Sequence, residues 1–461
     1  MTNETICAIS TAPGVGGIAV IRISGKEAIS LCDRIFQPRK AGKSLALQPA
    51  YSLTYGTIVE KGEAVDDVMM ALFRAPHSFT GEDTVEITCH GSVYIQQRIL
   101  QLLVATGCRL AKPGEFTQRA FMNGKMDLSQ AEAVADLIAS TSAGQHRLAL
   151  SQMRGGFSQE LKELRAKLLH ITSLMELELD FADHEELEFA DRSELKELAV
   201  QIEQVISHLV HSFKVGNAIK NGIPVAIIGE TNAGKSTLLN ALLNEEKAIV
   251  SDIHGTTRDV IEDTMYIHGL QFRFIDTAGI RDTHDTIENL GIERTFQKLE
   301  QADIVLWVID LSEASQQITQ LSGKILPLCQ DKQLILVLNK SDMAENIPID
   351  LSGFPKQTKT IPISAKQKQG INELQSMLVE SAQIPALSQN DVVVSNVRHY
   401  EALSHALDAI HRVQDGLNND LSGDFISQDL RECIFHISDI VGDVTTDEVL
   451  GNIFKHFCIG K

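Results

Sequence analysis

The sequence has no apolar run near the roughly 18 to 20 residues that span a bilayer, and its first ten residues lack a basic stretch followed by an apolar one. Its seven cysteines form no C-x-x-C pair, so their spacing encodes neither a disulfide framework nor a zinc site. Basic residues are not in excess: the formal net charge is −20 at pH 7, which argues against a protein that coats nucleic acid with a basic surface. These absences predict a soluble, cytoplasmic protein without a membrane segment, whose RNA contacts are local or shared with a partner.

The length of 461 residues predicts about three domains. Residues 1–118 carry short β-rich runs between Gly and Pro turns and one helical stretch, Val93–Thr106, which predicts an α+β domain. Apolar residues at helical spacing predict long packed helices over 119–213 and again over 384–461. Continuous apolar runs over 214–383 predict parallel strands buried on both faces. The expected fold class is therefore multidomain, α+β and α/β, with the α/β domain inserted in a discontinuous helical domain.

A phosphate-binding loop is predicted at Gly229–Ser236, which has the G-x-x-x-x-G-K-[ST] spacing between a strand at Val225–Ile228 and a helix. Glycines let backbone N–H groups face an anion, and the helix N-terminus adds the positive end of its dipole. Lys235 is expected to reach the β- and γ-phosphates as a catalytic residue, and Ser236 to ligate Mg²⁺. The expected nucleotide contacts of this loop are Asn232, Ala233, Gly234, Lys235, Ser236 and Thr237.

Three further elements follow in chain order and predict a P-loop GTPase domain. Asp276-Thr277-Ala278-Gly279 offers a carboxylate to Mg²⁺ and a glycine N–H to the γ-phosphate. Asn339-Lys340-Ser341-Asp342 places a carboxylate that accepts the paired N–H donors of guanine, and Ser364-Ala365-Lys366 completes the base pocket. Because adenine lacks that pair of donors, GTP is favoured over ATP.

The polar segment Gly255–Asp259 is expected to close over the γ-phosphate with a threonine hydroxyl on Mg²⁺. Thr257 is the favoured ligand and Thr256 is the alternative. Many GTPases place a water-orienting glutamine just after the D-x-x-G element, but this chain has Ile280 there. Glu288 is the candidate for orienting the attacking water, and a solvated helix carboxylate is an equally good interpretation of it.

Further motifs are dispersed over the chain: Pro13–Ser24, Ser78–Asp83, Pro113–Thr117, Gly124–Leu128 and Cys458-Ile459-Gly460-Lys461. Together with the GTPase elements they make the chain resemble the MnmE (TrmE) family of tRNA-modification GTPases, within the TrmE-Era-EngA-like superfamily. The resemblance implies a K⁺-dependent GTPase in which the cation substitutes for an arginine finger and two nucleotide domains dimerise. It places K⁺ on this chain at Asn232, Ser251, Ile253 and Thr256, with Glu288 acting through water.

The resemblance also implies that the N-terminal domain is similar to folate-binding domains, binds 5-formyl- or 5,10-methylene-tetrahydrofolate and forms a homodimer. Arg22, Glu86, Lys125 and Lys461 would contact the folate, and Cys458 would be a catalytic thiol. Read without the resemblance, each of the four charged residues is an ordinary surface charge.

The family implies a heterotetramer with an FAD-carrying partner similar to MnmG. Driven by GTP hydrolysis, this complex would install a (carboxymethyl)aminomethyl group at C5 of the wobble uridine of certain tRNAs, with folate as the one-carbon donor. One alternative is a ribosome-assembly GTPase, although its RNA-binding appendages are usually basic and the corresponding parts of this chain are neutral to acidic. The other is a nucleotide-switched scaffold, for which mutation of Cys458 would have no effect.

Overall fold

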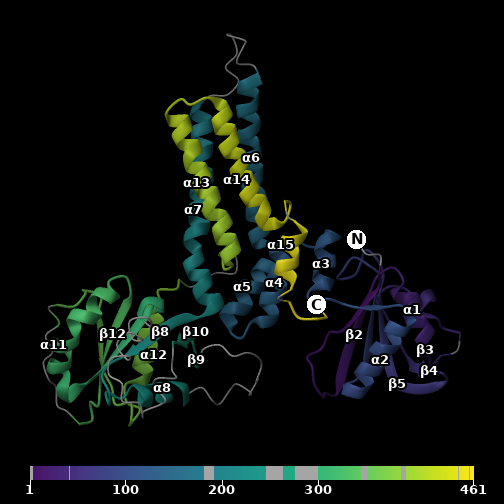
Figure 1. Cartoon of the computed structure of the whole chain (residues 1–461), viewed down its shortest axis with the longest axis horizontal. Helices are drawn as coiled ribbons and strands as arrows, with labels where there is room; N and C mark the ends of the chain where they lie inside the picture. The colour runs from purple at the N-terminus through teal and green to yellow at the C-terminus, as the bar shows by residue number, and fades with distance from the viewer. Residues whose placement is uncertain are drawn as a thin grey trace. The chain divides into compact units, whose positions relative to one another are not determined.

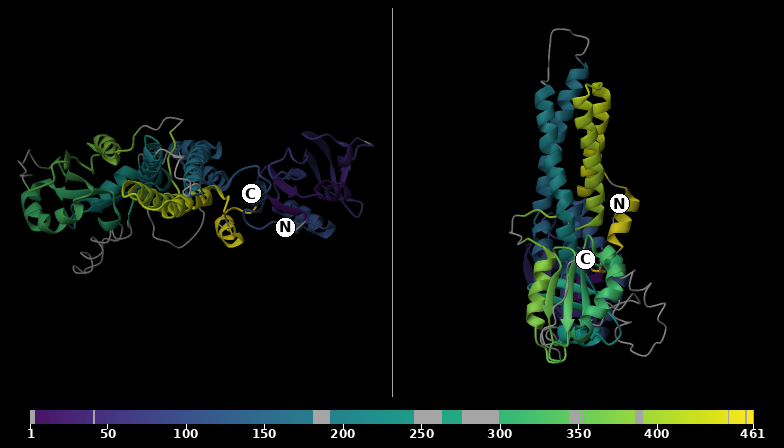
Figure 2. Two further views of the ribbon diagram at one scale, coloured as in Figure 1. Left: turned by 90° about the horizontal axis from the view of Figure 1, so that it is seen from above. Right: turned by 90° about the vertical axis from the view of Figure 1, so that its left-hand side faces the viewer.

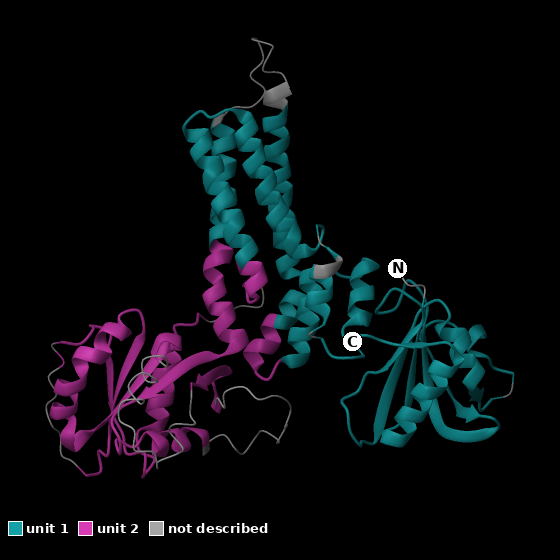
Figure 3. Cartoon of the chain, in the orientation of Figure 1, with its two compact units in different colours: residues 1–139, 149–207, 401–461 teal, residues 140–148, 208–400 magenta. Residues whose placement is uncertain are grey.

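The computed structural model describes residues 4–40, 42–180, 192–244, 263–275, 299–343, 351, 353–385, 391–444, 446–455 and 457–460. The chain divides into two compact units (Figure 3). Met1–Ala139, Ala149–Ser207 and Glu401–Lys461 form the first, and Ser140–Leu148 and His208–Tyr400 form the second. Among the described helices, none is long and apolar enough to cross a membrane. The bounds of the four segments expected from the sequence stay a prediction.

The N-terminal part of the first unit is a seven-stranded sheet with the order β3-β4-β5-β6-β2-β1-β7. Its strands are β1 (Ile6–Ile9), β2 (Ile18–Ser24), β3 (Phe36–Pro38), β4 (Ser52–Glu60), β5 (Glu63–Phe73), β6 (Thr84–His90) and β7 (Arg109–Leu110). Helices α1 (Ala28–Ile35) and α2 (Val93–Thr106) share a core with one face of the sheet (Figure 1). Alternate strand residues such as Ile21 and Ile87 point into that core, so the residues between them lie on the opposite face. The expectation of one helix here was wrong, because α1 is a second.

The helical part of the first unit is built from segments on both sides of the nucleotide domain. The helices are α3 (Glu115–Met122), α4 (Leu128–Ala139), α5 (Ala143–Met153), α6 (Gly156–Asp180), α7 (Arg192–Asn221), α13 (Val397–Asn418), α14 (Gly423–Val441) and α15 (Asp447–Phe454). Of these, α5, α7 and α13 each have one end in the second unit. Figures 1 and 2 show α6, α7, α13 and α14 side by side. Gln414 Nε2 donates to Ala199 O at 3.3 Å, and Arg431 Nη2 lies 2.6 Å from Glu176 Oε1. The expected discontinuous helical domain is therefore confirmed.

The second unit contains a six-stranded sheet with the order β13-β12-β11-β8-β10-β9. Its strands are β8 (Ile223–Ile228), β9 (Asp263–Ile267), β10 (Leu270–Phe274), β11 (Ile304–Asp310), β12 (Gln333–Asn339) and β13 (Lys359–Pro362), all parallel to their neighbours except β9. Helices α8 (Lys235–Asn244) and α12 (Ile371–Ala382) share a core with one face. Helix α11 (Ala314–Ile325) and the short helices η2 (Leu311–Glu313) and η3 (Leu326–Cys329) lie on the other. This arrangement explains the continuous apolar runs, because helices cover both faces of the central strands.

The chain enters and leaves the second unit's sheet domain at one place. Ser212 Oγ accepts a hydrogen bond of 3.0 Å from the backbone N–H of Val394, and Phe213 stacks on Tyr400 with ring centroids 4.4 Å apart. Gly216 leaves no room for a side chain, because a Cβ there would lie 2.0 Å from Val394 O. We call this group of residues the entry–exit clamp.

Candidate functional site

The phosphate loop lies between β8 and α8, in the strand–loop–helix context that its spacing requires. Two of its glycines are needed for close approach: a Cβ on Gly229 would lie 2.1 Å from Val308 O, and one on Gly234 would lie 2.1 Å from Asn339 Nδ2. Asn232 has a left-handed φ of 68°. The loop is therefore closely fitted to the ends of the neighbouring strands.

Lys235, the first residue of α8, turns its side chain back across the loop. Its Nζ donates to Gly229 O at 2.8 Å and to Glu230 O at 2.7 Å. Ser236 and Thr237 follow in the first turn of the same helix. The ammonium group and the helix N-terminus thus meet where the sequence predicts the β- and γ-phosphates.

Asn339, the last residue of β12, joins the phosphate loop to the predicted base pocket. Its Nδ2 donates to Ala233 O at 2.8 Å, and its Oδ1 accepts from Ala365 N at 3.0 Å. Both hydrogen bonds are buried, and the first joins residues that are 106 positions apart in the sequence. Ser364 is buried in the same place, whereas Asp342 and Lys366 are exposed beside it. Three sequence motifs that lie far apart in the chain therefore form one site.

Two polar contacts at the base pocket were not expected from the sequence. Lys340 has a left-handed φ of 64°, and its Nζ donates to Asp310 Oδ2 at 2.6 Å. Gln367 Nε2 donates to Asp342 Oδ2 at 3.2 Å. Asp310 has a signal that sequence reading can use, since it ends an otherwise apolar strand at the sheet edge where parallel α/β folds bind ligands. No comparable pattern marks Gln367.

Asp310 is ionised in this arrangement. Its burial raises the pKa of the carboxyl group, while hydrogen bonds from Lys340 and Ser312 lower it. The lowering prevails, so the pKa of Asp310 lies below its ordinary value. The contact with Lys340 is therefore a charge-assisted hydrogen bond.

Ten of the predicted site residues lie outside the described residues. They are Ser251, Ile253, Thr256, Thr257, Asp276, Thr277, Ala278, Gly279, Glu288 and Lys461. Of the residues predicted to ligate Mg²⁺, the structure therefore describes only Ser236, and of those predicted to ligate K⁺, only Asn232. The role of Glu288 stays a prediction.

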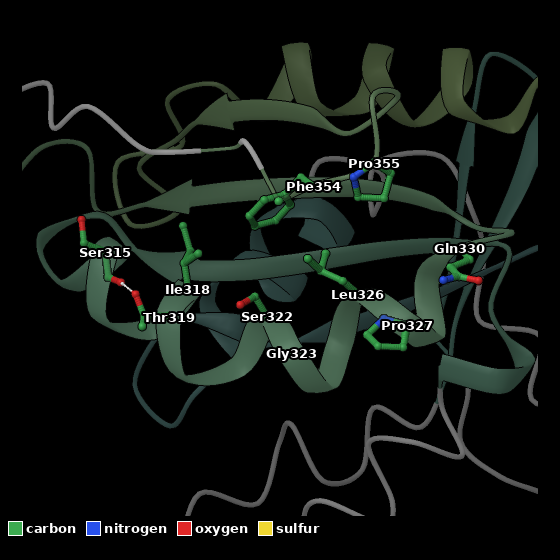
Figure 4. A pocket seen from close by; sticks show the side chains of 11 residues that line it. Ser315, Ile318, Thr319, Ser322, Gly323, Leu326, Pro327, Gln330, Phe354 and Pro355 are labelled. Atoms are coloured by element: carbon green, nitrogen blue, oxygen red, sulfur yellow. Dashed lines mark hydrogen bonds between the residues drawn. The ribbon is translucent and has the colours of Figure 1, made fainter.

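A concavity of about 800 Å³ lies elsewhere in the nucleotide domain, between α11, η3 and residues 353–355 (Figure 4). None of the residues that line it carries a charge. Phe354 on its rim stacks on the fully buried Trp307, with ring centroids 5.9 Å apart. It is separate from the phosphate loop and has no group suited to a triphosphate.

The N-terminal sheet brings two of the predicted folate contacts together on the face away from α1 and α2. Arg22 on β2 and Glu86 on β6 are cross-strand partners, with Nε 2.8 Å from Oε1. The Arg22 guanidinium also lies 5.5 Å from the ring centre of Phe79 and 5.7 Å from that of Phe116. Both aromatic residues belong to the dispersed motifs, but their contact with Arg22 was not foreseen.

Lys125 reaches the turn that carries Phe79. Its Nζ donates to Pro76 O at 2.9 Å, and a Cβ on Gly81 would lie 3.4 Å from Lys125 Cδ. The structure thus links Lys125 to the same turn, although not directly to Arg22 or Glu86.

The C-terminal tail docks on the N-terminal sheet domain. Gly460 O accepts a hydrogen bond of 3.0 Å from Ser10 Oγ, and Cys458 O accepts one of 3.4 Å from Gly114 N. Gly460 has φ of 96°, and a Cβ there would lie 2.1 Å from Ile9 O. Of the seven cysteines Cys458 alone is exposed. Its thiol is accessible, as a reactive cysteine requires.

Comparison with known proteins gives matches over nearly the whole chain. Residues 128–458 match the family described as "MnmE helical domain", and residues 5–125 match "GTP-binding protein TrmE N-terminus". A "tRNA modification GTPase MnmE" of Parabacteroides distasonis is 71% identical over 460 residues, covering 99% of this chain and 100% of the relative. A protein of the same name from Bacteroides thetaiotaomicron is 68% identical and covers 100% of both chains.

Among solved structures, that of Era in complex with MgGDPNP and nucleotides of 16S ribosomal RNA covers 40% of this chain and 66% of its own, at 28% identity. Its TM-score of 0.27 is too low to carry an argument. The family assignment rests instead on the full-length relatives and on the two family matches, which agree with the geometry of the phosphate loop and Asn339. The chain therefore belongs to the MnmE family of tRNA-modification GTPases.

Proposed function

We propose that the chain is a K⁺-dependent GTPase that modifies C5 of the wobble uridine of certain tRNAs, together with an FAD-carrying partner similar to MnmG and with a tetrahydrofolate as one-carbon donor. The GTPase part of this proposal rests on the two hydrogen bonds of Asn339, which join Ala233 of the phosphate loop to Ala365 of the base pocket. A cytoplasmic location suits a tRNA substrate.

The phosphates would lie over the N-terminus of α8, where Lys235 and the loop N–H groups face them. Ser236, Asp276 and either Thr257 or Thr256 would hold Mg²⁺, and Asn232, Ser251, Ile253 and Thr256 would hold K⁺. The two predicted ligands that the structure describes, the Ser236 hydroxyl and the Asn232 side-chain amide, fit these cations, because hydroxyl and amide oxygens suit hard cations. When bound, the two cations would offset the charge on the phosphates. Glu288 would orient the attacking water.

The folate half rests on the charged and aromatic group around Arg22. A tetrahydrofolate offers glutamate carboxylates to a guanidinium or ammonium group and pterin N–H donors to a carboxylate. Arg22, Glu86 and Lys125 supply these groups, and Lys461 would add a further cation. Phe79, which is partly exposed, gives the site an apolar wall, and the buried Phe116 supports the Arg22 guanidinium from behind. Cys458 would bring its thiol to the substrate, since Gly114, which binds the tail, lies two residues before Phe116.

A homodimer is supported by the uncovered face of the N-terminal sheet. Large apolar side chains stand exposed on it, including Ile18 at 68%, Leu53 at 65% and Tyr55 at 50%. Tyr55 on β4 and Met69 on β5 are cross-strand partners, and Leu53 lies two residues from Tyr55, so these three side chains form one patch, whereas Ile18 lies apart on β2. A second copy of the chain would bury this face.

Guanine recognition can be tested by exchanging Asp342 for asparagine. Asparagine presents an N–H where guanine also presents one, so Asp342→Asn should lose GTP turnover and gain turnover of xanthosine triphosphate, whose base carries an oxygen there. Asp331→Asn, an exposed exchange in the same unit, is the matched control and should leave both activities unchanged. An Asp342→Asn variant that still prefers GTP would remove the proposed base site.

The cation and modification steps need separate assays. Hydrolysis in matched KCl and NaCl, with Glu288→Ala alongside, should show K⁺ stimulation that the variant loses. Mass spectrometry of tRNA incubated with the chain, the partner and a folate should detect the C5 group, and Cys458→Ser should abolish it while GTP turnover persists. Equal rates in both salts would contradict the K⁺ role, and an unmodified uridine in the complete mixture would favour the ribosome-assembly or scaffold alternatives.

A further inference from the structure

None of the proposed nucleotide contacts involves Asp310. It is the last residue of β11, and the parallel pairing of β11 with β12 sets it beside Asn339. Only 9% of its surface is exposed. A buried carboxylate at the ligand-binding edge of a parallel sheet requires an explanation, because desolvation of a charge is unfavourable unless its partners are well placed.

The two carboxylate oxygens and the backbone N–H of Asp310 are bound by residues of η2 and α11 and by Lys340. Its Oδ1 accepts from Ser312 N at 3.1 Å and from Ser312 Oγ at 2.7 Å, and its own N–H donates to the buried Gln317 Oε1 at 3.2 Å. Its Oδ2 accepts from Lys340 Nζ at 2.6 Å. Ser312 therefore holds the carboxylate through Oδ1, independently of the contact of Oδ2 with Lys340.

Lys340 lies between two residues with direct parts in the base site. Asn339 precedes it and joins the phosphate loop to Ala365, and Asp342 follows two residues later. Lys340 has a left-handed backbone, which is unusual for a residue with a side chain. Anchoring its ammonium group on the neighbouring strand stretches the aliphatic stem along the carboxyl ends of β12 and β11.

We propose that Asp310 is a positioning residue for guanine nucleotides: by holding Lys340 Nζ it fixes the lysine stem as an apolar wall against the face of the base. This inference rests on the proposed assignment of Asn339-Lys340-Ser341-Asp342 to guanine. An aliphatic stem with an anchored charge presents a flat apolar surface, whereas a free lysine samples many rotamers and loses them on binding. Asp310 therefore acts on affinity and not on phosphate chemistry.

The primary test compares Asp310→Asn with Asp331→Asn. Asparagine keeps the shape and can still accept from Ser312, but it loses the charge that holds Lys340. The Kd for GTP and the Kd for GDP should both rise by roughly tenfold, the loss expected for a hydrogen bond to a charged group. The kcat at saturating GTP should change less than twofold. Asp331→Asn, the same exchange at an exposed position in the same unit, keeps the Lys340 contact and should leave both Kd values unchanged.

Two further measurements separate this role from a structural one. Inosine triphosphate lacks the 2-amino group that would meet Asp342, so the ratio of the Kd for ITP to the Kd for GTP should be the same in Asp310→Asn and in the unchanged chain. In a Lys340→Met background, Asp310→Asn should cause no further loss of affinity, because its partner is already gone. A fall in kcat or in the fraction of active sites without a rise in Kd would overturn the proposal.

The result for Asp342→Asn distinguishes a failure of the base-site assignment from a failure of the role proposed for Asp310. If that variant fails to accept xanthosine triphosphate, the base-site assignment itself is wrong. If it does accept it and Asp310→Asn binds GTP normally, the base site stands and the role of Asp310 is rejected.

Discussion

Arg119 binds Glu82 through Nη1, which lies 2.9 Å from Oε2, and the two residues are 37 positions apart in the sequence. Arg119 Nη2 also donates to Glu115 Oε1 at 3.1 Å. Arg119 is 11% exposed at its side chain, so this contact joins two dispersed motifs, Ser78–Asp83 and Pro113–Thr117, in a nearly buried place. Both motifs therefore have a structural role in the N-terminal domain.

Arg119→Met should destabilise this domain by about 2 to 4 kcal/mol, because it removes the arginine that pairs with Glu82 and leaves Glu115 with Arg109 alone. The measurement is urea unfolding of the full chain, followed at the transition of the N-terminal domain. Arg98→Met removes a more exposed pair with Glu60 in the same domain and should cost less than about 1 kcal/mol. Equal shifts for the two variants would mean that the Arg119 contacts contribute no more than a surface pair.

Lys235→Met should reduce GTP turnover by on the order of 100-fold or more, because it removes the cation predicted to face the phosphates. Lys332 is a matched control, since its Nζ also donates to two backbone carbonyls, those of Glu300 and Ala302. Steady-state hydrolysis of both methionine variants separates loss of charge at the loop from loss of a lysine that bridges carbonyls. A comparable defect in Lys332→Met would contradict the special role of Lys235.

Gly460→Ala should displace the C-terminal tail. A Cβ there would meet Ile9 O at 2.1 Å, and the left-handed φ is unfavourable for alanine. If Cys458 acts as proposed, tRNA modification should fall at least about tenfold while GTP turnover stays within twofold, because the thiol is misplaced and the nucleotide site is untouched.

Gly451→Ala is the control for that exchange, since nothing lies within 4 Å of a Cβ at Gly451. It should leave both activities unchanged. Full tRNA modification by Gly460→Ala would show that the tail contact with Ile9 and Ser10 is dispensable.

Acidification should weaken the helical bundle through His436. Burial and the neighbouring His405, which stacks on it at 5.1 Å between ring centroids, lower the pKa of His436, and this outweighs the opposite effect of Glu432 and Asp439. As the pH falls below the unfolded pKa of about 6.5, the unfolded chain takes up the proton first, so stability is lost. The denaturation midpoint of the bundle should therefore drop between about pH 7 and 5.5.

His436→Gln should flatten that pH dependence, whereas His170→Gln, at an exposed position on α6, should not. A midpoint that falls equally in all three proteins would assign the acid sensitivity to other groups.

The central strands of the nucleotide domain were predictable because helices cover both of their faces, which leaves an unbroken apolar run in β11. Helix α1 was missed because its eight residues are too few for periodicity to distinguish a helix from a strand. Strand β9 has no continuous apolar run, since it is an edge strand with a mixed burial pattern. Short and half-exposed elements carry little pattern of their own.

Within the site, the phosphate loop and Asn339 follow from spacing, because their residues act on a ligand of fixed shape. The contacts of Asp310 with Lys340 and of Arg22 with Phe79 do not. They depend on which strands become neighbours and in what register, and that is set by packing across the whole sheet. Sequence spacing therefore predicts the residues that contact a ligand better than it predicts the residues that hold those contacts in position.

The entry–exit clamp bears on how such a chain can change over evolution. Ser212 and Val394 are 182 residues apart in the sequence, yet their hydrogen bond joins the last turns of α7 to the segment before α13. With both connections tied at one point, whatever is inserted between them changes the geometry of the flanking helices little. A domain in this position can be enlarged, shortened or exchanged for another whose ends meet, and the helical segments would still find each other.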